Sequence, residues 1–254
     1  YELANADVVG GSGTMQGDPV GTQYTLGEVA RRMIAVSDNV GTNVLIERMG
    51  VEQIQAKADE LGLAGTQIAH KLMIGANDGK WNTISANDAA RILTRVAGGT
   101  LASADSCARA EEYLLEQEDD EGLAQGLPDG VAFGHKTGTV DNIRHDGGIV
   151  YAEHPYVICV LTKNMGYDTA NALMSQISSE FGEQMHLQGE HPIAHFLCFS
   201  PEKQSLIWTV NLLNDAARQV VFPVLESAKE IPLHELTLPV SEVRTFPAIS
   251  AEEL

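Results

Sequence analysis

Apolar side chains recur every three or four positions through most of the first 120 residues, and this period predicts amphipathic helices. The first helix is predicted over 25–36, where Thr25 and Glu28 have the spacing of a capping box. Further helices are predicted over 42–49, 51–61, 85–97 and 104–117, and glycines follow three of them. This part of the chain is therefore expected to be mainly helical.

The pattern changes to strands between residues 131 and 162. The β-rich segments 131–136, 147–152 and 156–162 are separated by turn residues, which predicts an antiparallel meander. A helical period returns over 168–185. Helices, then consecutive strands, then a closing helix predict an α+β domain with helices packed on an antiparallel sheet.

The last quarter of the chain has a different residue pattern, so we place a domain boundary at 187–191. Residues 1–187 are predicted to form the domain, and 188–254 a C-terminal extension for which the sequence indicates no role. Ser200 and Pro201 resemble the start of a helix that would run to about residue 227. Prolines break up the short β-prone pieces that follow.

Composition and charge exclude several classes of protein. The 254 residues include 16 basic and 35 acidic side chains, a net charge of −19, which disfavours binding to nucleic acid or anionic lipid. No apolar run approaches the roughly 18–20 residues of a membrane span, and the first residues lack the pattern of a signal peptide. The three cysteines are far apart and lack the spacing of a metal site, and Cys159 is expected in the core. No metal or cofactor is indicated.

Three short motifs carry the candidate chemistry: Gly11-Ser12-Gly13, Ser37-Asp38-Asn39 and His135-Lys-Thr-Gly-Thr139. Each is weak alone, but their order, spacing and predicted elements together resemble the penicillin-recognising serine hydrolases, a family that includes class A β-lactamases and D,D-peptidases. The resemblance spans residues 1 to about 187 and includes longer sequence segments, such as Arg32–Ile46, Leu127–Gly130 and Arg144–Val150. It implies a bacterial hydrolase that acts outside the cytoplasm through a serine ester.

The resemblance implies a role for each matched residue. Ser37 would pass a proton to the leaving nitrogen, and Lys136 would supply positive potential for that transfer and for a substrate carboxylate. Both side chains must reach the same nitrogen, so they are expected within one hydrogen bond or one bridging water of each other. Asn39 would hold the acyl side chain of the ligand. Asp38 is expected to cap backbone amides and shape the turn.

The segment Thr137-Gly138-Thr139 is implied to bind substrate. The two threonine hydroxyls would hold a carboxylate, and the backbone N–H of Thr139 would supply half of the oxyanion hole. The expected partner is thus a small molecule or peptide with a carboxylate. The sequence leaves open whether Arg144 and His145 line the site or the surface.

The nucleophile motif of this family, Ser-x-x-Lys, is missing from its expected place before Gly11. The one Ser-x-x-Lys in the sequence is Ser200-Pro-Glu-Lys203, which lies after the closing helix. We interpret it as a helix cap rather than as the nucleophile of a circular permutant. The chain is expected to begin downstream of its nucleophile, and so to be inactive by itself.

The deacylating glutamate of class A β-lactamases is also missing from the corresponding stretch, 70–82, where Asp78 would be a poor substitute. Two interpretations follow. The chain is part of a serine hydrolase that opens an amide or β-lactam bond, or it is a β-lactamase-like pseudoenzyme that binds ligands. A Ser-x-x-Lys encoded upstream of Tyr1 would favour the enzyme.

The strand 156–162 is predicted to need a partner. In the family two N-terminal strands pair beside it, and without them its edge would expose unpaired N–H and C=O groups. Part of 191–246 is expected to lie along this edge, with Ile193–Phe199 or Leu236–Val240 as candidates. Otherwise the chain should associate through the exposed edge.

Overall fold

The structure is a computed structural model that describes residues 1–73, 80–152, 155–187, 193–200, 205–212, 217–223 and 243–245, with side chains through Ser179. Its main helices are α1 (Leu26–Ala35), α2 (Asn39–Met49), α3 (Val51–Glu60), α4 (Ala86–Ala97), α5 (Ala104–Leu115) and α6 (Tyr167–Leu187). Short 3-10 helices are η1 (Asn5–Asp7), η2 (Met15–Gly17) and η3 (Ala124–Gly126). The strands are β1 (Ala132–Val140), β2 (Ile143–Tyr151), β3 (Tyr156–Leu161), β4 (Ile193–Ser200), β5 (Ser205–Leu212), β6 (Ala217–Pro223) and β7 (Val243–Thr245).

The helices predicted before residue 187 are confirmed, and local signals set their ends. Thr25 caps α1 by accepting a hydrogen bond from the Glu28 amide, while the Glu28 carboxylate pairs with arginines on the next turn. Gly50 and Gly62 both have positive φ, as expected of glycines that end helices. One boundary differs: α2 begins at Asn39 instead of residue 42, because the Asp38 carboxylate caps it.

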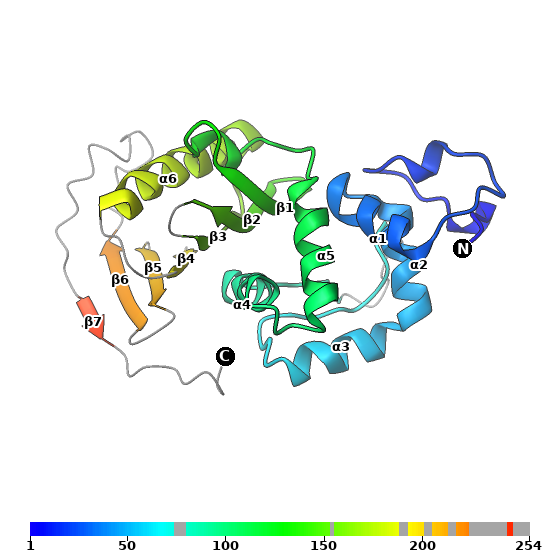
Figure 1. The fold of residues 1–254 in the computed structure, drawn as a ribbon, viewed down its shortest axis with the longest axis horizontal. Coiled ribbons are helices and arrows are strands. Elements are labelled where there is room, and N and C mark those ends of the chain that lie inside the picture. Colours follow the sequence, from blue (N-terminus) through cyan, green and yellow to red (C-terminus); the bar gives the residue numbers. More distant parts are fainter. Residues whose placement is uncertain are drawn as a thin grey trace.

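The three predicted strands form the expected antiparallel meander. β1 pairs with β2, and β2 with β3, in antiparallel register. β4 then pairs with β3 in parallel orientation, and β4 to β7 continue as antiparallel neighbours. Among the described residues, the sheet therefore has seven strands in chain order, with one parallel pairing that the sequence did not predict (Figure 1).

The helix predicted over 200–227 is wrong. Ser200 ends β4, and the region contains β5 and β6 where the helix was expected. Leu206, Trp208, Val210 and Leu212 alternate with their neighbours at a strand period, and they also fit an apolar helical stretch. Pairing with β4, which local sequence cannot report, decides between the two.

The edge of β3 is covered by the tail, as predicted. Ile193–Ser200 lies along β3, with Tyr156 opposite Ile193 and Val160 opposite Leu197. The alternative candidate, Leu236–Val240, lies outside the described residues. Backbone groups of β3 that would face solvent therefore have partners in the tail.

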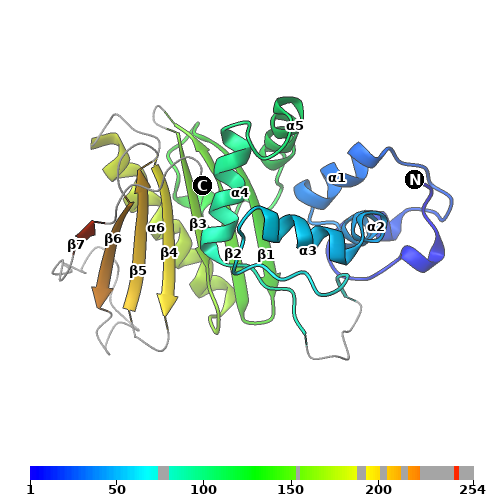
Figure 2. The same ribbon diagram turned by 90° about the horizontal axis from the view of Figure 1, so that it is seen from below.

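Helices cover both faces of the sheet (Figure 2). Ile149, Val157 and Cys159 pack with apolar residues of α4 and α5 on one face. Val150, Ile158 and Val160 pack with Met174 and Ile177 of α6 on the other. The alternation follows from the period of two along a strand. Cys159 is 1% exposed, which confirms its predicted place in the core.

Candidate active site

Ser37 and Lys136 meet where the helical region contacts the sheet. Ser37 lies between α1 and α2, Lys136 lies on β1, and the lysine Nζ donates hydrogen bonds to Ser37 Oγ and to the carbonyl of Thr137. The predicted contact between these side chains is confirmed. Ser37 has φ of 53°, a left-handed conformation that costs a residue with a Cβ roughly 1–2 kcal/mol. The surrounding contacts must therefore hold this backbone in place.

Asp38 supplies many of those contacts. Its carboxylate is fully buried and accepts hydrogen bonds from the backbone amides of Thr14 (2.6 Å), Met15 (2.8 Å) and Gly41 (2.9 Å). The first two amides belong to the loop that follows Gly13, and the third to the first turn of α2. The capping role predicted for Asp38 is borne out, and the same carboxylate joins the N-terminal loop to the Ser37 turn.

The Gly-Ser-Gly motif packs against the same turn. A Cβ on Gly13 would lie 2.4 Å from the Asp38 carboxyl, and one on Gly11 would lie 2.4 Å from Asn39 Nδ2. Both glycines also have positive φ. Only residues without a side chain fit this approach. Two of the three motifs noted in the sequence are thus parts of one packed unit.

Asn39, expected to contact the acyl side chain of a ligand, is half-buried at the start of α2. Its side-chain amide donates to the carbonyl of Gly10 (3.0 Å), and its backbone amide donates to the carbonyl of Ser12 (3.1 Å). The N-terminal loop therefore fixes the orientation of this side chain. Its ligand-binding role stays a prediction.

The charge of Lys136 depends on its surroundings. Burial disfavours the ammonium form and lowers the pKa to about 8, although Asp119 and Asp146 attract the positive charge. A lysine with a pKa near 8 can exchange a proton with a neighbouring hydroxyl close to neutral pH. The pair of Ser37 and Lys136 is therefore chemically suited to relay a proton.

The end of β1 holds a second polar group. Arg144 of β2 donates from Nη1 and Nη2 to both carboxylate oxygens of Asp119 (2.7 and 3.0 Å), and from Nη1 to the hydroxyl of Thr139 (3.0 Å). Its Nε donates to Asn171 on α6 (2.8 Å), and the ring of Tyr167 lies 5.1 Å from the guanidinium carbon. We call Asp119, Thr139 and Arg144, together with Thr137, the Arg144 cluster.

Ionisation within the Arg144 cluster follows from this pairing. Burial alone would raise the pKa of Asp119, but hydrogen bonds from Arg144 and Thr137 and the arginine charge lower it overall. Burial likewise disfavours charge on Arg144, and Asp119 outweighs this and raises the arginine pKa. Both side chains are ionised at neutral pH, and they form a bidentate ion pair.

A buried pair joins His135, the neighbour of Lys136 on β1, to Asp146 on β2. His135 Nδ1 and Asp146 Oδ1 share a hydrogen bond of 2.9 Å, and both side chains are almost fully buried. Asp146 Oδ2 also accepts from the amide of Leu123 (3.2 Å). Burial raises the pKa of Asp146 despite these bonds. This pair fixes β1 against β2 behind the lysine.

The structure answers the question about Arg144 and His145. Arg144 is 1% exposed and donates to the hydroxyl of the candidate site residue Thr139, whereas His145 Nδ1 accepts from the amide of Thr162 (3.1 Å) and thereby ties β2 to the chain after β3. Asp119, Asp146 and Asn171 were not predicted as site residues. A carboxylate directly before the apolar end of β2 was a usable signal for Asp146, but nothing local marks the other two. Asp78 lies outside the described residues.

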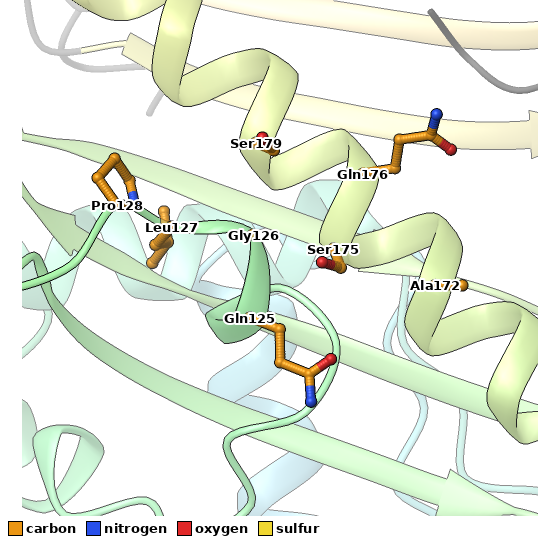
Figure 3. A pocket seen from close by; sticks show the side chains of 8 residues that line it. All are labelled: Gln125, Gly126, Leu127, Pro128, Ala172, Ser175, Gln176 and Ser179. Carbon is orange, nitrogen blue, oxygen red and sulfur yellow. The ribbon is translucent and has the colours of Figure 1, made fainter.

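A separate groove of about 690 Å³ lies between η3 and α6 (Figure 3). Its lining includes Gln125, Gly126 and Ser175 and none of the predicted site residues. The two segments approach closely there, since a Cβ on Gly126 would lie 1.9 Å from the Ser175 carbonyl oxygen.

No metal-binding group of three or more His, Cys, Asp or Glu side chains occurs within the described part of the chain. None of the described helices has the length and apolar character to cross a membrane.

Comparisons with known proteins identify the family and the fold. Residues 1–185 match the family model described as the beta-lactamase enzyme family. A search of the curated proteins found no match. A beta-lactamase from Sphaerobacter thermophilus DSM 20745 is similar in structure, with a TM-score of 0.69 and 23% identity over 75% of this chain and 74% of its own.

Two further solved structures share the fold. PBP-A matches with a TM-score of 0.67 and 24% identity over 74% of this chain and 71% of its own, and a mutant of it was solved as an acyl-enzyme complex with penicillin G. An ancestral class A beta-lactamase, GNCA, matches with a TM-score of 0.65 and 22% identity over 73% and 75%. Identities this low establish the common fold alone.

Proposed function

The chain belongs to the beta-lactamase enzyme family, and we propose that it forms the proton-transfer and ligand-binding part of a serine hydrolase acting on an amide or β-lactam bond. The observation that carries this proposal is the direct hydrogen bond from Lys136 Nζ to Ser37 Oγ. The two residues come from positions 99 apart in the chain. Acyl transfer to serine needs a proton donor for the leaving nitrogen, and this pair can supply it.

The roles of the other residues follow from their positions. Lys136, protonated below about pH 8, stabilises negative charge that develops beside Ser37. Asn39 is held at the same turn, where it would contact the acyl portion of a ligand. Thr137, Gly138 and Thr139 continue β1 past the lysine and would line the other side of the reacting bond, with the Thr139 amide as an oxyanion donor. Ser37 is the proton relay and not the nucleophile.

The nucleophile is proposed to belong to a Ser-x-x-Lys other than Ser200-Pro-Glu-Lys203, the one such motif in these 254 residues. Ser200 is the last residue of β4 and so does not begin a helix, as the serine of such a motif should. This observation also favours a second candidate function, a β-lactamase-like module that binds the ligand without acylation. A Ser-x-x-Lys in residues encoded upstream of Tyr1 would distinguish the enzyme from the module.

A fluorescent penicillin tests the proposal on the full chain. Fluorescence anisotropy should show reversible binding that weakens by about tenfold in Lys136→Met, since a charge-assisted contact is lost. Lys57→Met is the matched control because Lys57 forms an exposed ion pair on α3, and its binding should equal that of the wild type. Absence of any binding would show that the proposed function is wrong.

Covalent labelling by the same penicillin, followed on a denaturing gel, tests the assignment of the nucleophile. The chain as given should remain unlabelled. If it carries its upstream residues and these include Ser-x-x-Lys, it should acylate and turn over slowly, because the 70–82 stretch has no glutamate. A label mapped by mass spectrometry to Ser200 in the present chain would contradict this assignment.

A further inference from the structure

The Arg144 cluster includes the two threonines that the family resemblance assigns to the carboxylate of a ligand, and it already contains a carboxylate, that of Asp119. Asp119 belongs to the acidic segment 116–121 that follows α5, far from β1 in the sequence. Both of its oxygens accept hydrogen bonds from Arg144. This is the bidentate geometry with which arginine binds a free carboxylate.

The donors of Arg144 are nearly all in use. An arginine has five N–H groups. Asp119 engages one on each terminal nitrogen, Thr139 a second on Nη1, and Asn171 the one on Nε. The Tyr167 ring lies over the guanidinium group as well. A ligand carboxylate could therefore bind Arg144 only by replacing Asp119.

Asp119 is the accessible member of the pair. Its side chain is 34% exposed, against 1% for Arg144, so Asp119 is the member of the pair that a ligand can reach from solvent. Thr137, whose hydroxyl the family resemblance assigns to the substrate carboxylate, lies on β1 two residues before Thr139, which shares Arg144 with Asp119. The Asp119 carboxylate also attracts the positive charge of Lys136.

We propose that Asp119 is a specificity-determining residue that occupies the carboxylate position of the site and selects ligands whose group there is uncharged, such as an ester or amide. This inference rests on the proposed function of the Ser37 and Lys136 pair. A ligand with a free carboxylate must displace Asp119 or accept repulsion from it. An uncharged group avoids the repulsion and can still accept from Thr137 or Thr139.

The test compares benzylpenicillin with its methyl ester by isothermal titration calorimetry, using the full chain near neutral pH. In the wild type the ester should bind at least as tightly as the acid. In Asp119→Asn the affinity for the acid should rise by about tenfold, the effect of one charge-assisted hydrogen bond. Affinity for the ester should change by no more than about twofold.

Asp120→Asn is the matched control, because it removes the same charge from the neighbouring exposed residue. It should leave the ratio of acid to ester affinity as in the wild type. Asp119→Ala is a second variant, in which the carboxylate is removed without placing an amide N–H₂ against the arginine. Thermal unfolding verifies that each variant is folded. The ratio of acid to ester affinity in the wild type tests the inference even if a variant fails to fold.

The outcomes separate this inference from the function on which it rests. The inference is overturned if benzylpenicillin binds the wild type about tenfold more tightly than its methyl ester does. It is also overturned if neither Asp119 variant changes the ratio of these two affinities. If neither compound binds any of the proteins, the proposed function is wrong and the inference falls with it.

Discussion

Replacing Asp38 with asparagine preserves the size of the side chain but turns one carboxylate oxygen into an N–H₂ group. In the wild type, Oδ2 accepts from the amides of Thr14 and Met15, and Oδ1 accepts from the amide of Gly41. Asparagine has one acceptor oxygen, so in either orientation its N–H₂ faces at least one buried backbone N–H. The variant D38N thus tests how strongly this single carboxylate holds the active-site turn.

The magnitude follows from the number of bonds affected. A hydrogen bond to a charged group contributes about 1.5–3 kcal/mol, and an unsatisfied buried donor costs about 1–3 kcal/mol. At least one bond is lost outright in D38N, and the remaining bonds lose the charge of their acceptor. We therefore expect the free energy of unfolding to fall by about 3–5 kcal/mol, within the range seen when a buried polar network is broken.

Urea unfolding followed by far-UV circular dichroism measures this loss. The control is Ser103→Ala, which removes an exposed N-cap of α5 that accepts one hydrogen bond from the Ser106 amide. That cap should contribute about 1 kcal/mol. If D38N is destabilised no more than Ser103→Ala, then Asp38 is an ordinary helix cap and the argument that it fixes the Ser37 turn is refuted.

Three further predictions concern other parts of the chain. The folded-state pKa of Lys136, about 8, lies below its ordinary value of 10.5, so the unfolded chain holds this proton more tightly and folding is penalised at low pH. Relative to Lys136→Met, the wild type should therefore gain about 2 kcal/mol in urea-unfolding free energy between about pH 7 and 9.5, and a constant difference would contradict the shift. Deleting 188–254 removes β4 and exposes the edge of β3, so the product should dimerise or aggregate and unfold at a lower temperature. Light scattering and thermal unfolding check this, and an equally stable monomer would show that the tail is an independent appendage. Gly126→Ala places a Cβ against the α6 backbone and should cost about 1–3 kcal/mol. Gly17→Ala, where a Cβ meets no atom within 4 Å, should be nearly neutral in the same urea titration, and equal losses would refute the packing argument.

Local signals in the sequence determined much of the helical part and of the sheet core. The cap at Thr25 and the glycines at 50 and 62 act on backbone groups within a few residues, so their effect can be predicted without the fold. The alternation that places Val157 and Cys159 on one face of β3 likewise follows from strand geometry. The contact between Ser37 and Lys136 was predicted because a shared chemical task requires it.

Long-range pairing decided the rest. The segments 205–212 and 217–223 carry a pattern that suits a helix or a strand, and pairing that begins at the neighbouring β4 makes them strands. In the sequence, Asp119 is one of several acidic residues in the segment 116–121. Its ion pair with Arg144, 25 positions later, is what distinguishes it from the others. A sequence pattern reports the period and the chemistry of side chains. The tertiary structure alone brings the charges of Asp119 and Arg144 to 2.7 Å from each other, and the proposal that Asp119 selects the ligand depends on this contact.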